Sequence, residues 1–201
     1  MRIRNDRATW GIVSQALHWL IAAMIFAQIA LALIFKQLPR GPELFAIVND
    51  HKSLGLAILV VALIRLIWRW ANAVPDLPDT LNPRERSAAR FTHRALYALI
   101  IAMALTGWFG SAALGFTFRW FNLFQVPNPI GKDVRVGHTL YATHSILALA
   151  LGLVLLLHIA AAIRHHWILK DDTLRRMLPG GATGSGGLSR VEKNPGTGAQ
   201  R

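Results

Sequence analysis

Four long apolar segments constrain this sequence more than any other feature. About 20 apolar residues in a helix are enough to cross the ~30 Å hydrocarbon layer of a membrane. The segments have this length and carry few charges, and they cover approximately Gly11–Phe35, Asp50–Trp70, Ala88–Leu114 and His138–His166. We therefore predict an all-α fold, a four-helix transmembrane bundle in a lipid bilayer. Residues 1–178 would form this domain, and the Gly- and Ser-rich residues 179–201 would be a disordered tail.

The connections between these segments give weaker signals. We interpret Lys36–Asn49, which contains two prolines, as a short loop. Asn82 and Pro83, followed by Glu85, have the pattern of a helix start and favour a third helix that begins there. The longer connection Gly115–Gly137 is rich in aromatic residues, which favours a loop lying against the outer membrane interface.

The positive charges flank the apolar segments instead of forming one basic surface. A net charge of +12 in a soluble protein would suggest a nucleic-acid partner. Here the excess of Lys and Arg lies before the first segment, between the second and third, and after the fourth. Cytoplasmic segments of membrane proteins carry such an excess. We therefore expect both termini in the cytoplasm and no nucleic-acid partner.

The histidines give the strongest indication of function. Several of the eight lie inside apolar segments, where an ionisable side chain is costly and usually functional. His144 and His158 are fourteen residues apart, so on one helix they differ by only ~40° in direction and by ~21 Å in height. A single iron cannot bind both, whereas two haems stacked along the helix can each take one. The alternative is that two polar residues share one face by chance.

Each iron needs a second histidine, and depth in the membrane selects it. With the N-terminus inside, His18 and His158 lie at similar depths near the inner surface, and His51 and His144 lie near the outer surface. His93 is the rival of His18 for the inner iron. His138 and His166, like His93, are also compatible with interfacial side chains that reach out to water. The chain has no cysteine, which excludes covalently attached c-type haem. We predict two non-covalent haem b groups.

Helical spacing suggests roles for two further residues. Arg65 lies fourteen residues after His51 and is expected at the inner layer, where its guanidinium could pair with a haem propionate. His165 lies seven residues beyond His158, on nearly the same face and ~10 Å deeper, where it could hydrogen-bond a quinone. The alternatives are an arginine that reaches out to the inner surface and an interfacial histidine pair, His165 with His166.

The chain resembles the bacterial cytochrome b561 family of the superoxide oxidase type over Leu17–Pro179. The resemblance implies that His18, His51, His144 and His158 ligate two haem b groups in the inner membrane. It also implies a superoxide:quinone oxidoreductase that oxidises superoxide at the outer face and reduces ubiquinone of the membrane pool, with no protein partner required. The segments that carry it are Leu17-His18-Trp19, Asp50-His51-Lys52-Ser53-Leu54-Gly55, Thr92-His93-Arg94, Tyr141-Ala142-Thr143-His144, Leu157-His158-Ile159-Ala160-Ala161-Ala162, His165-His166-Trp167 and Lys170–Pro179.

The outer connections are net basic, which suits an anionic substrate. Lys52 adjoins His51, and Arg135 lies just before the fourth apolar segment, so both could steer superoxide by their field. Ordinary solvated loop charge is the alternative for both residues. Two other functions fit the histidines. One is a cytochrome b anchor subunit that carries electrons between a partner dehydrogenase or hydrogenase and quinone. The other is a non-redox membrane protein that binds a metal or senses pH.

Overall fold

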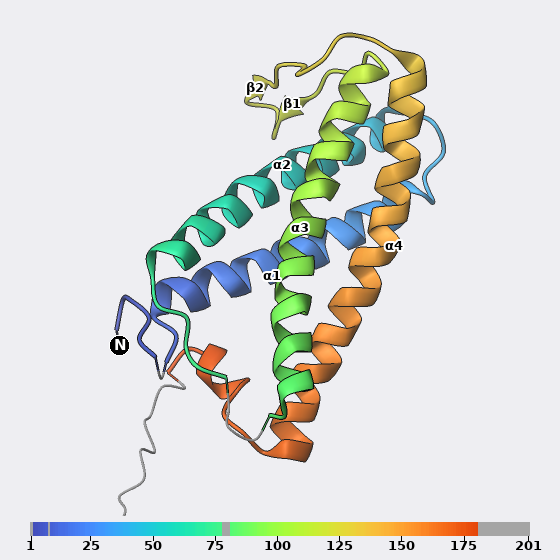
Figure 1. Cartoon of the computed structure of the whole chain (residues 1–201). Coiled ribbons are helices and arrows are strands. Elements are labelled where there is room, and N and C mark those ends of the chain that lie inside the picture. The colour runs from blue at the N-terminus through green and yellow to red at the C-terminus, as the bar shows by residue number, and fades with distance from the viewer. Residues whose placement is uncertain (1, 8, 78–80, 181–201) are drawn as a thin grey trace, which may run out of the picture.

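The computed structural model describes residues 2–7, 9–77 and 81–180 (Figure 1). Four long helices make up most of this part of the chain, and each is long and apolar enough to cross a membrane. They are α1 (Ile12–Phe35), α2 (Pro42–Ala71), α3 (Pro83–Ala113) and α4 (Val134–Arg164). The predicted all-α, four-helix membrane fold is therefore confirmed. The predicted tail lies, beyond Gly180, outside the described residues.

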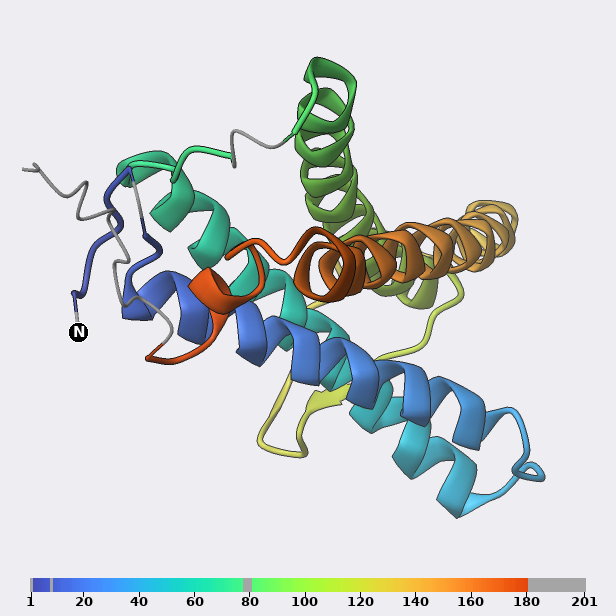
Figure 2. The same cartoon turned by 90° about the horizontal axis from the view of Figure 1, so that it is seen from below.

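The helices form two antiparallel hairpins that cross one another. Figures 1 and 2 show α1 running beside α2, and α3 running beside α4, with the two pairs splayed apart. Contacts between α2 and α3 join the pairs. The N-terminus and the end of the described chain lie at one end of the molecule (Figure 1), which we call the terminal end. The other end, which carries the strands β1 (Arg119–Trp120) and β2 (Phe124–Gln125), is called the hairpin end.

Three segments meet at the terminal end and close it. The N-terminal segment contacts the α2–α3 connection through a backbone hydrogen bond of 2.9 Å from Asp76 N to Arg7 O. The segment after α4 reaches the same connection, because Arg176 donates to the carbonyl oxygen of Asp76 at 3.2 Å. These bonds hold the three segments together on one side of the bundle.

The helix starts follow local capping signals rather than the apolar boundaries. α2 begins at Pro42, not at Asp50, so Pro42–Asn49 is helical and the predicted loop is shorter than expected. Proline suits the first helical position because it has no N–H to leave unpaired, and Glu43 in the first turn suits the helix dipole. The expected start of α3 is confirmed, because Asn82 and Glu85 bond each other's backbone in a capping box.

The aromatic connection between α3 and α4 is a folded hairpin and not only an interfacial loop. β1 and β2 pair antiparallel, and Phe121 and Asn122 have positive φ at the turn. The hairpin is held against α2 by Ser53, whose fully buried hydroxyl donates to Asn49 O and accepts from the N–H of Phe121 at 2.9 Å. The hairpin therefore lies over α2 only two residues from His51.

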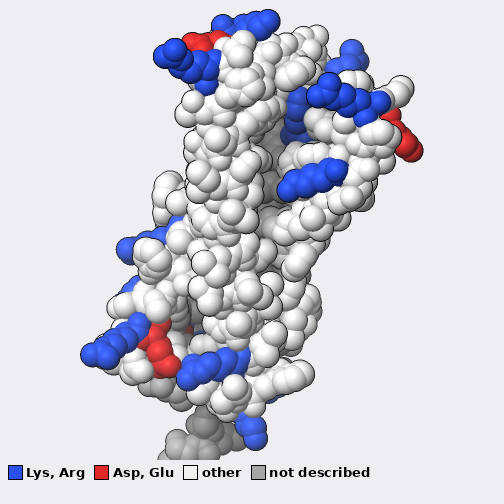
Figure 3. Space-filling model, turned by 90° about the vertical axis from the view of Figure 1, so that its right-hand side faces the viewer, with Lys and Arg blue, Asp and Glu red and all other residues white. Residues whose placement is uncertain are grey.

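The core is small, and much of the apolar surface faces outward. Ile21, Ile25, Ile58, Ala62 and Ile100 form the buried cluster where α1, α2 and α3 meet. On the outer sides of the helices, large apolar side chains such as Leu149 are up to 79% exposed. Lys and Arg gather towards the two ends of the face drawn in Figure 3. A lipid layer around the middle of the bundle would cover this apolar surface.

Candidate functional site

At the terminal end, three histidine rings from three helices lie together. The ring centroids of His18 on α1 and His158 on α4 are 6.2 Å apart. The ring of His93 on α3 lies 5.5 Å from that of His158. The predicted inner pair is therefore brought together, and its predicted rival lies beside it. The contact between His18 and His158 bridges the two helical hairpins.

At the hairpin end, the ring of His144 is fixed by α3. Its Nδ1 lies 2.9 Å from the carbonyl oxygen of Met103 and 3.2 Å from Oγ1 of Thr106. Because Thr106 already donates its hydroxyl proton to Ala102 O, it can accept from His144. Nδ1 therefore donates, and Nε2 is left as the nitrogen available to a metal. This is the usual arrangement of a metal-binding histidine.

A glycine on α3 makes room for this ring. A Cβ added at Gly107 would stand 3.1 Å from Cε1 and 3.3 Å from Nδ1 of His144. Ordinary carbon contacts lie at about 3.5–4.0 Å, so any larger residue would displace the ring. The small residue on α3 thus determines how closely α4 and its histidine approach.

His51 on α2 is held from the neighbouring helix α1. The amide nitrogen of Gln28 donates to the carbonyl oxygen of His51 at 3.0 Å and lies 3.1 Å from Nε2 of its ring. Among the described residues, neither Nδ1 of His51 nor Oε1 of Gln28 has a hydrogen-bond partner, although both are buried. An unpaired buried polar atom costs about 1–3 kcal/mol, which indicates a site where a ligand completes the bonding. His51 also lies within electrostatic range of His144.

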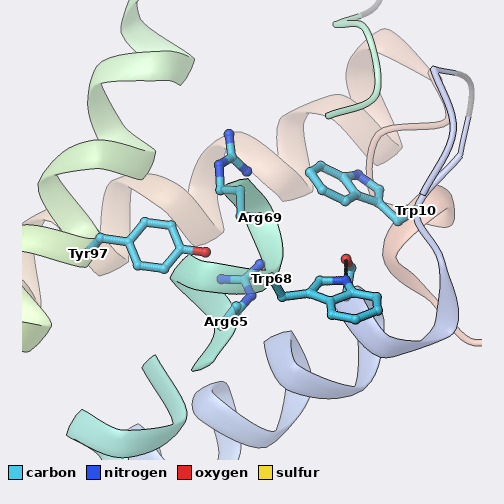
Figure 4. A pocket seen from close by; sticks show the side chains of 6 residues that line it. Trp10, Arg65, Trp68, Arg69 and Tyr97 are labelled. Atoms are coloured by element: carbon cyan, nitrogen blue, oxygen red, sulfur yellow. Dashed lines mark hydrogen bonds between the residues drawn. The ribbon is translucent and has the colours of Figure 1, made fainter. Parts of the chain in front are cut away.

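Arg65 faces a small cavity between α1, α2 and α3. Figure 4 shows Tyr97 of α3 reaching toward Arg65 and Arg69 of α2, with Trp10 and Trp68 opposite. The guanidinium carbon of Arg65 lies 5.5 Å from the centre of the Tyr97 ring. Arg65 is also close enough to His18 and His158 to interact electrostatically with both. Arg65 therefore lies near the two histidines His18 and His158 of the terminal end.

A second and larger cavity opens beside Arg69 on the α2–α3 side. Its volume is about 390 Å³, and no Asp or Glu is among the side chains that line it. They are Leu66, Arg69, Trp70, Arg90, His93, Arg94 and Tyr97. Since His93 lines this cavity and also contacts His158, the cavity borders the inner histidines.

The remaining predicted site residues lie at the two ends. At the hairpin end, Nζ of Lys52 lies 5.5 Å from the ring centre of Phe116 and 5.9 Å from that of Phe118. Arg135 is exposed in the first turn of α4. At the terminal end, Nδ1 of His165 bonds Oδ2 of Asp171 at 2.5 Å.

Comparison with known proteins identifies the family. Residues 9–180 match the model of the family described as prokaryotic cytochrome b561. The chain belongs to this family. Cytochromes b561 are membrane electron-transfer proteins that bind haem b, so the chain is an oxidoreductase of bacterial membranes and not a non-redox sensor.

The names of individual relatives agree with membership of this family. The chain is 33% identical over 185 residues to cytochrome b561 homolog 2 of Escherichia coli K12, covering 89% of this chain and 95% of the relative. It is 29% identical over 163 residues to a protein of Yersinia pestis named probable superoxide oxidase CybB, covering 81% and 92%. Cytochrome b561 homolog 1 of E. coli is 27% identical over 169 residues, covering 81% and 93%.

The residues of this b561 chain fit haem b. Histidine rings from three helices meet at the terminal end, and His51 and His144 interact electrostatically at the hairpin end. Nδ1 of His144 is anchored to α3, and none of the described residues bonds its Nε2. The buried Nδ1 of His51 has no hydrogen-bond partner among the described residues. Gly107 leaves space beside a ring where a Cβ would intrude. Haem that is held between two histidines has no open iron position, which suits electron transfer.

Sequence reasoning gave no role to several residues that shape these sites. Thr106, Gly107, Gln28 and Asp171 each touch a candidate histidine through space from another element or turn. A weak signal existed for Gln28, since a polar side chain inside an apolar helix is costly and usually has a purpose. No sequence spacing relates Thr106 or Gly107 to His144.

Proposed function

We propose that this cytochrome b561 holds two haem b groups in two layers. His18 and His158 would ligate the one nearer the terminal end, and His51 and His144 the one nearer the hairpin end. The observation that carries the proposal is the 6.2 Å between the rings of His18 and His158. Two imidazole nitrogens that each bind a metal at about 2 Å stand about 4 Å apart, and half a ring width behind each puts the centroids roughly 6 Å apart.

The same distance favours His18 over His93. The His93 and His158 rings are 5.5 Å apart, which is closer than two rings that share one iron. His93 would have to withdraw to become a ligand, whereas His18 would not. We therefore assign His93 to the wall of the inner site. Arg65, which lies near His18 and His158, is our proposed partner for a haem propionate.

We further propose that electrons come from superoxide at the hairpin end and leave to ubiquinone in the membrane. The name of the Y. pestis relative supports the first substrate. The overall reaction oxidises two superoxide ions to two O₂ and reduces one quinone, with two protons, to quinol. When bound, haem b supplies the one-electron transfer that links the two substrates.

The chain's own residues would guide both substrates. Lys52 and Arg135 at the hairpin end would attract the superoxide anion by their positive charge. His165, which follows α4 at the terminal end, would bond a quinone carbonyl. The excess of Lys and Arg at the terminal end supports a cytoplasmic location of that end in an inner-membrane protein. The hairpin end would then face outward, where superoxide arrives.

A spectroscopic experiment tests the proposal. Pyridine haemochrome and protein assays of the purified chain should give two haems, and the visible spectrum should be that of low-spin, bis-histidine haem. Superoxide should reduce the haem, and added ubiquinone should reoxidise it. A value of one haem in fully loaded protein would refute the two-layer arrangement. Haem that superoxide leaves oxidised would refute the proposed electron donor.

A further inference from the structure

The end of α4 has an unusual backbone that serves one side-chain contact. After Arg164 the helix widens into a π-helical turn, His165–Leu169, and then Lys170 adopts a left-handed conformation with φ of 52°. π-turns are rare and occur frequently at functional sites, and positive φ is uncommon for lysine. Together they turn the chain back so that Asp171 meets His165.

The contact between these two side chains is buried and tightly held. Nδ1 of His165 lies 2.5 Å from Oδ2 of Asp171, and the two side chains are only 14% and 9% exposed. The other carboxylate oxygen, Oδ1, accepts from the N–H of Thr173 at 2.9 Å. The N–H of Asp171 in turn donates to the carbonyl oxygen of His165 at 3.1 Å. In the described part of the chain, no residue bonds Nε2 of His165.

The charges around the pair leave Asp171 as the ionised partner of His165. Burial raises the pKa of Asp171, but hydrogen bonds from Thr173 and His165 outweigh it and hold the pKa below its usual range. Two of the neighbouring charges have partners of their own: Arg164 pairs with Glu85 of α3 at 3.3 Å, and Asp172 pairs with Arg175 at 3.6 Å. His166, Lys170 and Arg176 are the other charged or titratable groups of this segment.

We propose that Asp171 and His165 form the proton-donating pair for quinone reduction, with His165 as the donor and Asp171 as its positioning residue. This inference rests on the proposed function. The Nδ1–H of His165 keeps donating to the Asp171 carboxylate, and the Nε2 proton passes to a carbonyl oxygen of the quinone. Two electrons from two superoxide ions and two protons convert one quinone to quinol. Water at the terminal end reprotonates His165 between the two transfers.

Position supports this role. His165 lies seven residues beyond His158, so along the helix it is ~10 Å from the proposed inner haem ligand. The candidate membrane span that contains α4 runs to Leu169, so His165 lies in its last turn and Asp171 lies just beyond it. A group here can contact a quinone in the membrane on one side and exchange protons with the aqueous phase on the other.

A purely structural role is the competing explanation. The turn sends the chain back to α1, where Gln15 donates to the carbonyl oxygen of Arg176 at 2.9 Å and Trp19 to that of Met177 at 2.7 Å. Asp171 could serve only to shape this turn. An asparagine can accept the bond from the Thr173 N–H with its Oδ1 and donate with its NH2 group to Nδ1 of a neutral His165, so the turn does not need the negative charge. Proton donation does need it.

The substitution Asp171→Asn therefore separates the two roles. The full-length holoprotein, reduced chemically beforehand, is mixed with a short-chain ubiquinone at several pH values, and haem reoxidation is followed. We expect Asp171→Asn to lower the maximal rate by about 10-fold or more without raising KM for the quinone. The pH dependence of its rate should also differ from that of the wild type, because proton transfer to the quinone has lost the carboxylate partner. Asp171→Glu should restore both, and Asp172→Asn, a neighbouring exposed acid, should match the wild type.

Chemical reduction keeps the outcome separate from the superoxide assignment. Superoxide could fail to reduce the wild type while the rate of the pre-reduced protein still depends on Asp171. That result would support the proton-donating pair and refute superoxide as the electron donor. An Asp171→Asn protein with the wild-type rate and pH profile would leave only the structural role. Equal losses in Asp171→Asn and Asp171→Glu, or in Asp172→Asn, would also overturn the inference. A pre-reduced wild type that quinone leaves reduced would overturn both proposals.

Discussion

Replacing Gly107 by alanine tests the outer haem site most directly. The new Cβ would stand 3.1 Å from Cε1 and 3.3 Å from Nδ1 of His144. Ordinary contacts begin near ~3.5 Å, so the ring has to move by about 0.4 Å. It cannot do so freely, because its Nδ1 is bonded to Met103 O at 2.9 Å and to Thr106.

The cost can be estimated from overpacking in other proteins. Inserting a methyl group into a packed site costs about 1–3 kcal/mol. If the ring can move away from the new methyl group only when haem is absent, the outer haem binds about 5- to 150-fold more weakly. We expect Gly107→Ala to lose the outer haem first during haem titration, or to keep it with a shifted midpoint potential, while the inner haem is unchanged.

Gly152→Ala is the matched control. Gly152 lies on α4 and a Cβ there meets no atom within 4 Å. Both substitutions gain the same helix propensity, so their difference isolates the contact with His144. Haem titration with pyridine haemochrome detection and a potentiometric titration would measure it. Two fully bound haems with unchanged potentials in Gly107→Ala would refute the assignment of His144 as a ligand.

Three further predictions concern the other sites. His18→Ala should remove the inner haem and leave the outer spectrum recognisable, whereas His93→Ala should leave both haems bis-histidine ligated; the opposite pattern would reverse the assignment. Haem reduction by superoxide in stopped-flow experiments should slow as salt rises, because charge attraction is screened over ~8 Å at physiological ionic strength. Lys52→Glu or Arg135→Glu should also slow the reduction without loss of haem. A rate that changes neither with salt nor with these substitutions would exclude electrostatic steering. The pKa of Asp171 is lower in the folded chain than its usual value of 3.8, so the carboxylate stabilises the segment 165–177 above pH 3.8, and this stabilisation is lost as the pH falls below that value. Hydrogen exchange of this segment should therefore become faster at such low pH in the wild type and vary less with pH in Asp171→Asn.

The number and class of the helices were predictable from the sequence because a membrane imposes its thickness on the chain. Apolar runs of about 20 residues have few other uses, and all four became helices. The relative positions of two histidines on one helix were also predictable, because a regular helix has a fixed rise and rotation per residue. α4 is regular from Val134 to Arg164, so His144 and His158 share a face at two heights. Family membership agreed with the motif resemblance.

Helix ends and the aromatic connection were less predictable. The length of an apolar run reflects the lipid layer and does not fix where a helix begins. α2 starts at Pro42, ahead of its apolar run, because proline suits the first helical position. The β1–β2 hairpin depends on Ser53 of α2, whose hydroxyl is 68 residues away in sequence from the Phe121 N–H that it accepts. A local pattern cannot contain such a bond.

By itself, then, the sequence determined the four membrane helices, the histidines at two depths and the family, because these follow from helical geometry and apolar length along one segment. Only the tertiary structure decided which side chains meet. It brought His18 closer to the spacing of an iron ligand than His93, put Gly107 and Thr106 against His144, and joined His165 to Asp171. The physical reason is that these contacts cross between helices or around a turn, and packing in three dimensions, not spacing in one, sets their distances.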